Sequence, residues 1–120
     1  MSAAEEARTT IRNYFDAVDA NDFDRVISLF DSDIVYDRPG YDPIRGVERL
    51  RQFFTNDRVI ASGKHEIEGI LVDGDQVAAW GRFSGQSRSG AELNESFCDI
   101  YEMKGTRICG RRTYFFRPGV

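Results

Sequence analysis

The chain has 120 residues, a formal net charge of −4 and 41% hydrophobic residues, which suits one soluble domain, spanning residues 1–120, with a single core. An acidic surface without a basic tract repels nucleic acid, and no apolar stretch approaches the roughly 18 residues that cross a bilayer. The polar start, Met1 to Arg8, lacks the apolar centre of a secretory signal, so we expect a cytoplasmic protein that binds neither membranes nor nucleic acid.

Helical spacing dominates the first part of the chain. Ser2 and Glu5 form a capping box, and the apolar residues that follow recur at helical intervals, which predicts a helix over residues 3–20. Asn21 or Asp22 caps a second, shorter helix, which buries a stripe made of Phe23, Val26, Ile27 and Phe30. We expect residues 31–33 to end this helix.

A short strand over residues 34–37 comes next, and the following loop, residues 38–43, contains two prolines and a glycine and is suited to a pocket mouth. A third helix begins near Gly46 and fades around Asn56. Beyond about Gly63 the pattern is that of strands over residues 65–72, 76–84, 93–103 and 107–116, with reversals at 73–75, 85–90 and 104–106. This order of elements predicts an α+β fold with helices on one side of an antiparallel meander.

The final hairpin carries a buried acid. A three-residue turn would place Asp99 opposite Arg111, Phe97 opposite Thr113 and Tyr101 opposite Cys109. A carboxylate among aromatic rings costs several kcal/mol, roughly, unless it is paired or protonated, so Asp99 is either a structural ion pair with Arg111 or chemically employed. We favour chemistry. Cys98 and Cys109 lie on opposite faces of this hairpin, which predicts no disulfide, and two cysteines with a single histidine make a poor metal site.

The chain resembles a known family over nearly its whole length. The residues that carry the resemblance are the runs Tyr14–Ala17, Asn21–Asp24 through Leu29–Phe30, and Gly110–Phe115. They are similar to the ketosteroid isomerase and SnoaL-like branch of the NTF2-like superfamily. The resemblance implies a cone in which a curved, mainly antiparallel sheet wraps around three N-terminal helices, a ligand pocket inside the cone, and a homodimer formed through the outer sheet face.

The resemblance also implies site residues. In ketosteroid isomerases a tyrosine of the first helix and a protonated aspartate on the penultimate strand donate hydrogen bonds to the enolate, and a second aspartate shuttles the proton. Tyr14 and Asp99 match the first two. The third match is displaced by one residue, so either Asp37 acts as the base or Arg38 occupies its site; we favour Asp37. Arg111 across the hairpin, or Arg82 on the next strand, would keep Asp99 ionised, which makes Asp99 a candidate general base or an arginine-oriented acid rather than a donor.

Further pocket residues follow from the same fold. The resemblance points Trp80, Arg82 and Ser84 inward, although periodicity alone does not separate them from Val77, Ala79 and Phe83. His65, in phase with Ile67 and Leu71, also points inward and is suited to relaying a proton. Each residue has a structural alternative: Tyr14 and Trp80 as core, His65 as a satisfied structural histidine, Glu95 as a solvated rim residue, and Arg82 as a counter-charge.

We therefore predict an enzyme of secondary metabolism, without cofactor or metal, that abstracts a proton beside the carbonyl group of a polyketide-like or polycyclic substrate and so isomerises or cyclises it. The predicted catalytic residues are Asp99, Tyr14, Asp37, His65 and Arg111. The predicted substrate-binding residues are Arg82, Trp80, Arg38, Phe97, Thr113 and Glu95. Two alternatives remain: a non-catalytic ligand-binding or dimerisation domain, and epoxide opening by Asp37 and Asp99 around one water. The limonene epoxide hydrolase branch differs here, because its final-strand aspartate corresponds to Thr113.

Overall fold

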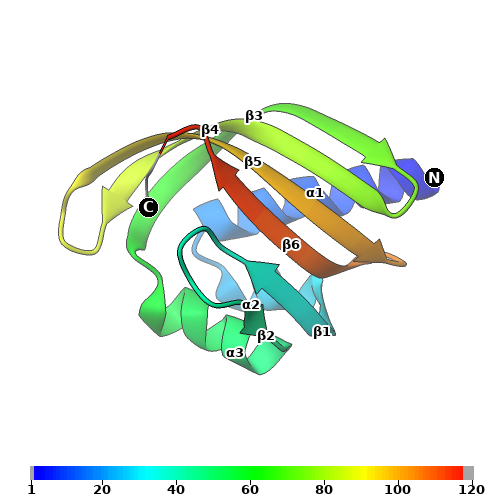
Figure 1. Ribbon diagram of the computed structural model, residues 1–120, viewed down its shortest axis with the longest axis horizontal. Helices are drawn as coiled ribbons and strands as arrows, with labels where there is room; N and C mark the ends of the chain where they lie inside the picture. Colours follow the sequence, from blue (N-terminus) through cyan, green and yellow to red (C-terminus); the bar gives the residue numbers. More distant parts are fainter. Residues whose placement is uncertain (1, 118–120) are drawn as a thin grey trace.

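A curved six-stranded sheet wraps around a long N-terminal helix, with strand order β2-β1-β6-β5-β4-β3 (Figure 1). The computed structural model describes residues 2–117. The strands are β1 (Phe30–Asp37), β2 (Ile44–Arg45), β3 (Ile60–Asp73), β4 (Gln76–Ser87), β5 (Glu92–Lys104) and β6 (Arg107–Phe115). The sheet is mixed, because β1 and β6 run parallel while the other neighbours are antiparallel. The predicted α+β class is confirmed.

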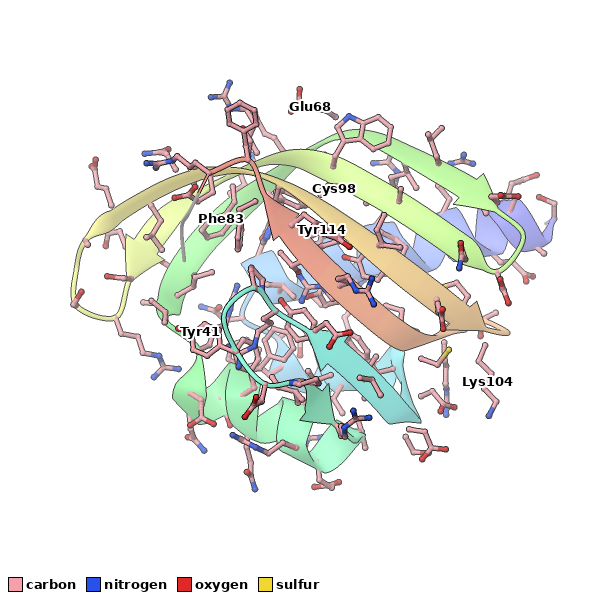
Figure 2. The ribbon with its side chains drawn as sticks, in the orientation of Figure 1. Tyr41, Glu68, Phe83, Cys98, Lys104 and Tyr114 are labelled. Carbon is pink, nitrogen blue, oxygen red and sulfur yellow. The ribbon has the colours of Figure 1, made fainter. Side chains whose placement is uncertain are left out.

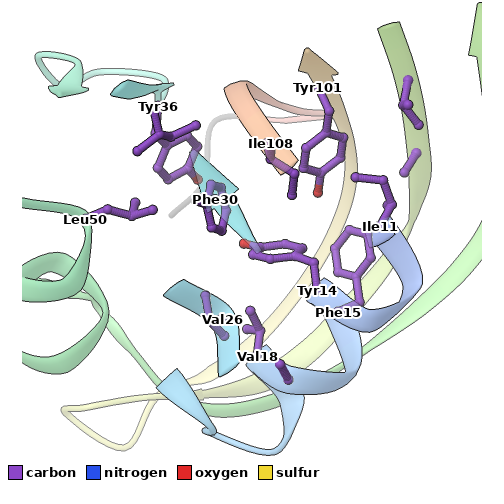
Figure 3. Close-up of a cluster of buried hydrophobic side chains, with 14 of the residues drawn as sticks. Ile11, Tyr14, Phe15, Val18, Val26, Phe30, Tyr36, Leu50, Tyr101 and Ile108 are labelled. Atoms are coloured by element: carbon purple, nitrogen blue, oxygen red, sulfur yellow. The ribbon is translucent and has the colours of Figure 1, made fainter. Parts of the chain in front are cut away.

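The first helix, α1 (Ala3–Asp19), forms where the capping box predicts it, and the Ser2 hydroxyl accepts a hydrogen bond from the Glu5 amide at 3.1 Å. Its buried side carries aromatic and aliphatic residues that form the core with strands β1, β5 and β6 (Figure 3). Asp22 caps the short helix α2 (Phe23–Ser28). None of the helices among residues 2–117 is long and apolar enough to span a membrane.

Strand β1 is longer than predicted. Residues 31–33 do not end a helix but belong to the strand, which begins at Phe30. The sequence did not show this because β1 pairs with β6, more than seventy positions away, and local spacing carries no sign of such a partner. Phe30 is nevertheless buried, as predicted, at 3% exposure. Residues 38–43 form the predicted loop, and the two-residue strand β2 follows it.

The third helix changes its geometry midway. It begins as an α-helix, α3 (Val47–Gln52), and ends in a π-helical turn, η1 (Phe53–Asp57), in which the Arg58 amide donates to the Phe53 carbonyl at 2.8 Å. An uninterrupted α-helix would return residue 57, seven positions after Leu50, to the buried side. The wider turn adds a residue to the circuit, so that Asp57 is exposed and Arg58 is buried instead.

The β5–β6 hairpin differs from the prediction in its register. The turn contains two residues, Gly105 and Thr106, and a bulge lies between the Glu102 and Met103 pairings. Asp99 therefore lies opposite Thr113, and Tyr101 lies opposite Arg111, so the three predicted pairings are wrong. The bulge inserts one residue into β6 and reverses its alternation, which turns Arg111 and Thr113 toward the concave side.

Candidate functional site

A cavity opens between α1, the π-helical turn and the concave face of the sheet. The space open to the centres of water molecules is about 90 Å³. Figure 2 shows Phe83 on the sheet side and Tyr41 in the loop before β2; both line the cavity, and Tyr41, 53% exposed, lies at its mouth. Much of the remaining wall is aromatic and includes Tyr14, Tyr36, Phe53, Phe54, Phe97 and Phe115.

Asp99 lies in the wall with no exposed surface and accepts three hydrogen bonds. Its Oδ2 accepts from the Tyr101 hydroxyl at 2.9 Å and from Arg111 Nη2 at 3.0 Å, and its Oδ1 accepts from the Thr113 hydroxyl at 2.6 Å. Because the Thr113 proton points to Asp99, the Tyr36 hydroxyl donates to Thr113 Oγ1 at 3.1 Å. Both Asp99 oxygens are thus occupied by donors, which suits an ionised carboxylate and leaves it little capacity to take a further proton.

Arg111 connects this acid to the aromatic wall. Its guanidinium carbon lies 4.3 Å from the centre of the Tyr36 ring and 5.0 Å from that of Tyr14. Burial is the largest influence on Arg111 and works to lower its pKa, but Asp99 together with the surrounding tyrosine hydroxyls outweighs it, so the pKa lies well above the ordinary value. Its buried Nε has no hydrogen-bond partner among residues 2–117.

Tyr14 presents a phenol from α1 to the cavity. The residue is 1% exposed, and its ring packs edge-on against Phe15, Phe30 and Tyr101 at centroid distances of 5.2, 5.5 and 6.0 Å (Figure 3). Burial raises the pKa of Tyr14 far above its ordinary value, so the hydroxyl keeps its proton. Within the described part of the chain no group hydrogen-bonds this hydroxyl, which leaves it available as a donor.

His65 and Asp19 form a carboxylate–imidazole pair at the cavity wall. His65 Nδ1 lies 2.6 Å from Asp19 Oδ1, and the His65 backbone amide donates to the other Asp19 oxygen at 2.9 Å. A carboxylate only accepts, so Nδ1 carries the proton and Nε2 is left with a lone pair. The rings of Phe15, Phe83 and Phe97 enclose the imidazole at centroid distances of 4.9, 4.7 and 5.4 Å. This arrangement orients His65 as a base.

Two further arginines line the cavity, and neither is in an ion pair with a described residue. Arg58 is 6% exposed, and its guanidinium lies 5.6 Å from the Phe54 ring centre. Burial lowers the pKa of Arg58. The Arg38 guanidinium lies 4.3 Å from the Tyr41 ring centre and 4.5 Å from that of Phe53. Neither arginine donates a side-chain hydrogen bond or forms an ion pair within residues 2–117.

The structure thus brings most of the predicted site residues into one cavity. Those that line it are Tyr14, Arg38, His65, Phe97, Asp99, Arg111 and Thr113. Asp37 does not line it; its side chain is 40% exposed and lies 3.7 Å from Arg112. The ion pair between Asp99 and Arg111 that the structural interpretation predicted is present as well. The same arrangement is compatible with a structural and with a chemical role of Asp99.

Trp80 and Arg82 face the other way. In β4 the buried alternation is Val77, Ala79 and Phe83, so the prediction that Trp80, Arg82 and Ser84 point inward is wrong. Trp80 lies opposite Gly69 of β3, where a Cβ would collide with the indole, so the ring covers a glycine on the convex face.

Two predictions about Glu95 and β3 also need correction. Glu95 is not a solvated rim residue, because it is 8% exposed and its Oε1 accepts from Arg117 Nη2 at 3.1 Å. It lies outside the cavity lining, beside a polar groove near the end of β6. In β3 a bulge between Ile67 and Gly69 shifts the alternation, so that Leu71 is 63% exposed although His65 faces inward.

Sequence reasoning missed four residues that shape the site. Tyr36 alternates with Ile34 in a predicted strand, so its inward direction could have been inferred. Asp19 lies four positions after Phe15 on one helix face, but only the fold brings His65 beside it. Arg58 faces the cavity because of the π-helical turn, and Phe83 faces it because the inward face of β4 is the opposite of the one that the resemblance implied. Local sequence spacing indicates neither.

Comparisons with known proteins agree with this fold. The profile of the SnoaL-like domain family matches residues 11–111. An LEH-like epoxide hydrolase from M. tuberculosis has a TM-score of 0.85 at 24% identity, over 95% of this chain and 85% of that one. A putative SnoaL-like polyketide cyclase from Jannaschia sp. has a TM-score of 0.84 at 13% identity, over 97% and 89%. At these identities the likeness concerns the fold.

A shorter sequence match involves the orange carotenoid-binding protein of Synechocystis sp. The two sequences are 44% identical over 48 residues, which are 40% of this chain and 15% of that protein. The match therefore covers a small part of a much longer relative.

Proposed function

This chain belongs to the family of SnoaL-like domains, and we propose that it is an enzyme that removes a proton beside the carbonyl group of a small cyclic substrate of secondary metabolism. The proposed outcome is double-bond migration or ring closure, with acid–base groups of the chain alone. The observation that carries the proposal is the Asp19–His65 pair, 2.6 Å between oxygen and nitrogen, at the wall of a cavity whose other unsatisfied polar groups are donors.

His65 is the base in this proposal. Asp37 lies outside the cavity lining, and Asp99 already accepts hydrogen bonds from three donors, so neither is suited to take the proton. His65 Nε2 takes the proton from the α-carbon. The C–H electron pair forms a C=C bond with the carbonyl carbon, and the carbonyl π pair moves onto the oxygen to give the enolate. The imidazolium then returns the proton at another carbon, or the enolate carbon attacks a second carbonyl and the new alkoxide takes the proton.

Tyr14 and Arg111 stabilise the enolate in this scheme. The Tyr14 hydroxyl keeps its proton because burial raises its pKa, and Arg111 is fixed by Asp99 and two aromatic rings. Donors that are already oriented toward the developing charge need no rearrangement during the reaction, and each contributes about 3 kcal/mol of barrier lowering. Asp99 is a positioning residue here, since it acts through Arg111.

The size of the cavity favours a small substrate. The space of about 90 Å³ lies well below the roughly 300–1,000 Å³ of pockets for drug-sized ligands, which suits a molecule of one or two rings better than a larger polycyclic one. The aromatic wall suits a flat apolar ring system.

The experiment is α-proton exchange in D₂O. The protein is incubated with a panel of mono- and bicyclic β-diketones and β-keto esters, and deuterium incorporation at the α-carbon is followed by mass spectrometry against a buffer blank. Exchange above the blank for at least one compound supports the proposal. Compounds that bind to the cavity but exchange at the blank rate contradict it, and point to the non-catalytic ligand-binding domain instead.

Epoxide opening is less well supported. It requires two carboxylates around one water, whereas Asp99 is the one acid among the described residues that line the cavity. The likeness to the LEH-like epoxide hydrolase concerns the fold and does not supply the second acid.

A further inference from the structure

The cavity carries more positive charge than the proposed reaction uses. Three arginines line it, and Asp99 is the one carboxylate among the described residues of the lining. Asp99 binds Arg111 at 3.0 Å, and among residues 2–117 neither Arg38 nor Arg58 forms an ion pair. This excess lies inside a protein whose overall formal charge is −4.

Arg58 shows the imbalance most clearly. The residue is 6% exposed, and no acceptor within residues 2–117 receives a hydrogen bond from its guanidinium. A buried charge without a partner is costly, and proteins normally pair it or satisfy its donors. Burial lowers the pKa of Arg58, and the like charge of Arg111 lowers it further. An arginine held in this way is suited to a ligand that brings the missing negative charge.

Arg38 lies on the same wall. Its guanidinium contacts the Phe53 ring, and the Arg58 guanidinium contacts the Phe54 ring, while these neighbouring rings are 5.2 Å apart. The buried Nε of Arg38 has no hydrogen-bond partner among the described residues. The π-helical turn therefore presents two adjacent rings, each packed against a guanidinium that donates no hydrogen bond within residues 2–117, and Arg38 also packs on Tyr41 at the cavity mouth.

We propose that Arg38 and Arg58 bind the carboxylate of a small planar ligand, whose apolar ring lies among the aromatic side chains of the cavity. A guanidinium pairs with a carboxylate through parallel hydrogen bonds, and the geometry of the fork discriminates against neutral groups. The two arginines carry their positive charge before any reaction begins. The negative charge that pairs with them must therefore belong to the ligand itself and not to an enolate formed later. The proposal rests on the proposed function only in taking this ligand to be the substrate, which is then a cyclic keto acid.

The test uses benzoate and its neutral counterpart benzamide, titrated calorimetrically into the wild-type protein at low ionic strength. Benzoate is expected to bind at least about tenfold more tightly than benzamide. Arg58→Gln is expected to weaken benzoate binding about 10- to 100-fold and to leave benzamide binding unchanged. Arg82→Gln, the same change on the exposed convex face, is the matched control and leaves both affinities unchanged. Arg38→Gln provides a second variant should Arg58→Gln fail to fold.

Equal affinities for benzoate and benzamide, no benzoate binding in the millimolar range, or unchanged benzoate binding in the folded arginine variants would overturn the inference. These outcomes do not depend on turnover. Benzoate binding with no α-proton exchange, either in the neutral panel or in cyclic keto acids, leaves the carboxylate site in place and removes the enzymatic proposal. Exchange in neutral ketones without benzoate binding removes the carboxylate site and leaves the enzymatic proposal in place.

Discussion

Arg111 reaches Asp99 from a diagonal position in the β5–β6 hairpin: Nη2 lies 3.0 Å from Asp99 Oδ2, although the residue opposite Asp99 is Thr113. The Asp99 side chain is fully buried, and the Arg111 side chain is 10% exposed. The Asp99 carboxylate thus fixes the position of the Arg111 guanidinium in the cavity wall.

The buried pair predicts a large stability effect. Asp99→Asn leaves the Arg111 charge buried without its partner, and we expect the free energy of unfolding in urea to fall by about 3 kcal/mol. Asp37→Asn is the matched control, because its partly exposed carboxylate lies 3.7 Å from Arg112, and surface pairs contribute less than about 1 kcal/mol. Similar losses in the two variants would contradict the role given to Asp99.

The buried phenol predicts a dependence on alkaline pH. Burial raises the pKa of Tyr14 above the ordinary value of 10, so the folded protein binds this proton more tightly than the unfolded chain. The resulting stability is complete below about pH 10 and is lost as the pH rises further. Tyr101, whose pKa burial also raises, adds to the loss. We expect Tyr14→Phe to reduce the slope of unfolding free energy against pH above pH 10.

Tyr114→Phe is the control for this titration, since it removes an exposed hydroxyl on the outer sheet face. Its slope should match that of the wild type. A Tyr14→Phe slope as steep as the wild-type slope would show that the phenol is not held in a buried, neutral state.

The Asp19–His65 pair predicts a graded loss of activity. With a substrate found by the exchange assay, His65→Gln is expected to lower kcat by about 10²- to 10⁴-fold because it removes the base. Asp19→Asn should cost less and leave KM unchanged, because the ring remains but loses its orientation. Asp16→Asn, an exposed acid on the same helix, is the control and should behave as wild type. Equal activity in the Asp19 and Asp16 variants would argue against the pair.

The sequence was sufficient where local rules decide the outcome. The capping box placed α1 within one residue, and the alternation of the final hairpin put Asp99 inside the fold. The sequence was not sufficient where a bulge or a π-helical turn changes which residues of an element face the core. The bulge near Glu102 moved the hairpin register, and the π-helical turn exchanged Asp57 for Arg58 on the buried side. Both irregularities reposition arginines of the cavity.

The convex face shows a different limit. Both faces of β4 mix polar and apolar residues, so the sequence pattern does not show which face is buried. The family resemblance was used instead, and it placed Trp80 and Arg82 on the wrong face. The covering of Gly69 by Trp80 depends on strand pairing, which sequence spacing alone does not give. The homodimer expected through this face stays a prediction.

The most direct test of the central claim needs no substrate, since His65 is the only histidine of the chain. Nitrogen-15 NMR of the imidazole in mildly alkaline solution reports which ring nitrogen carries the proton. We expect the neutral tautomer protonated at Nδ1, toward Asp19, with Nε2 unprotonated and its resonance shifted when a ligand enters the cavity. A proton on Nε2 and a bare Nδ1 would contradict it, because His65 would then face the cavity as a donor and could not take a proton from carbon.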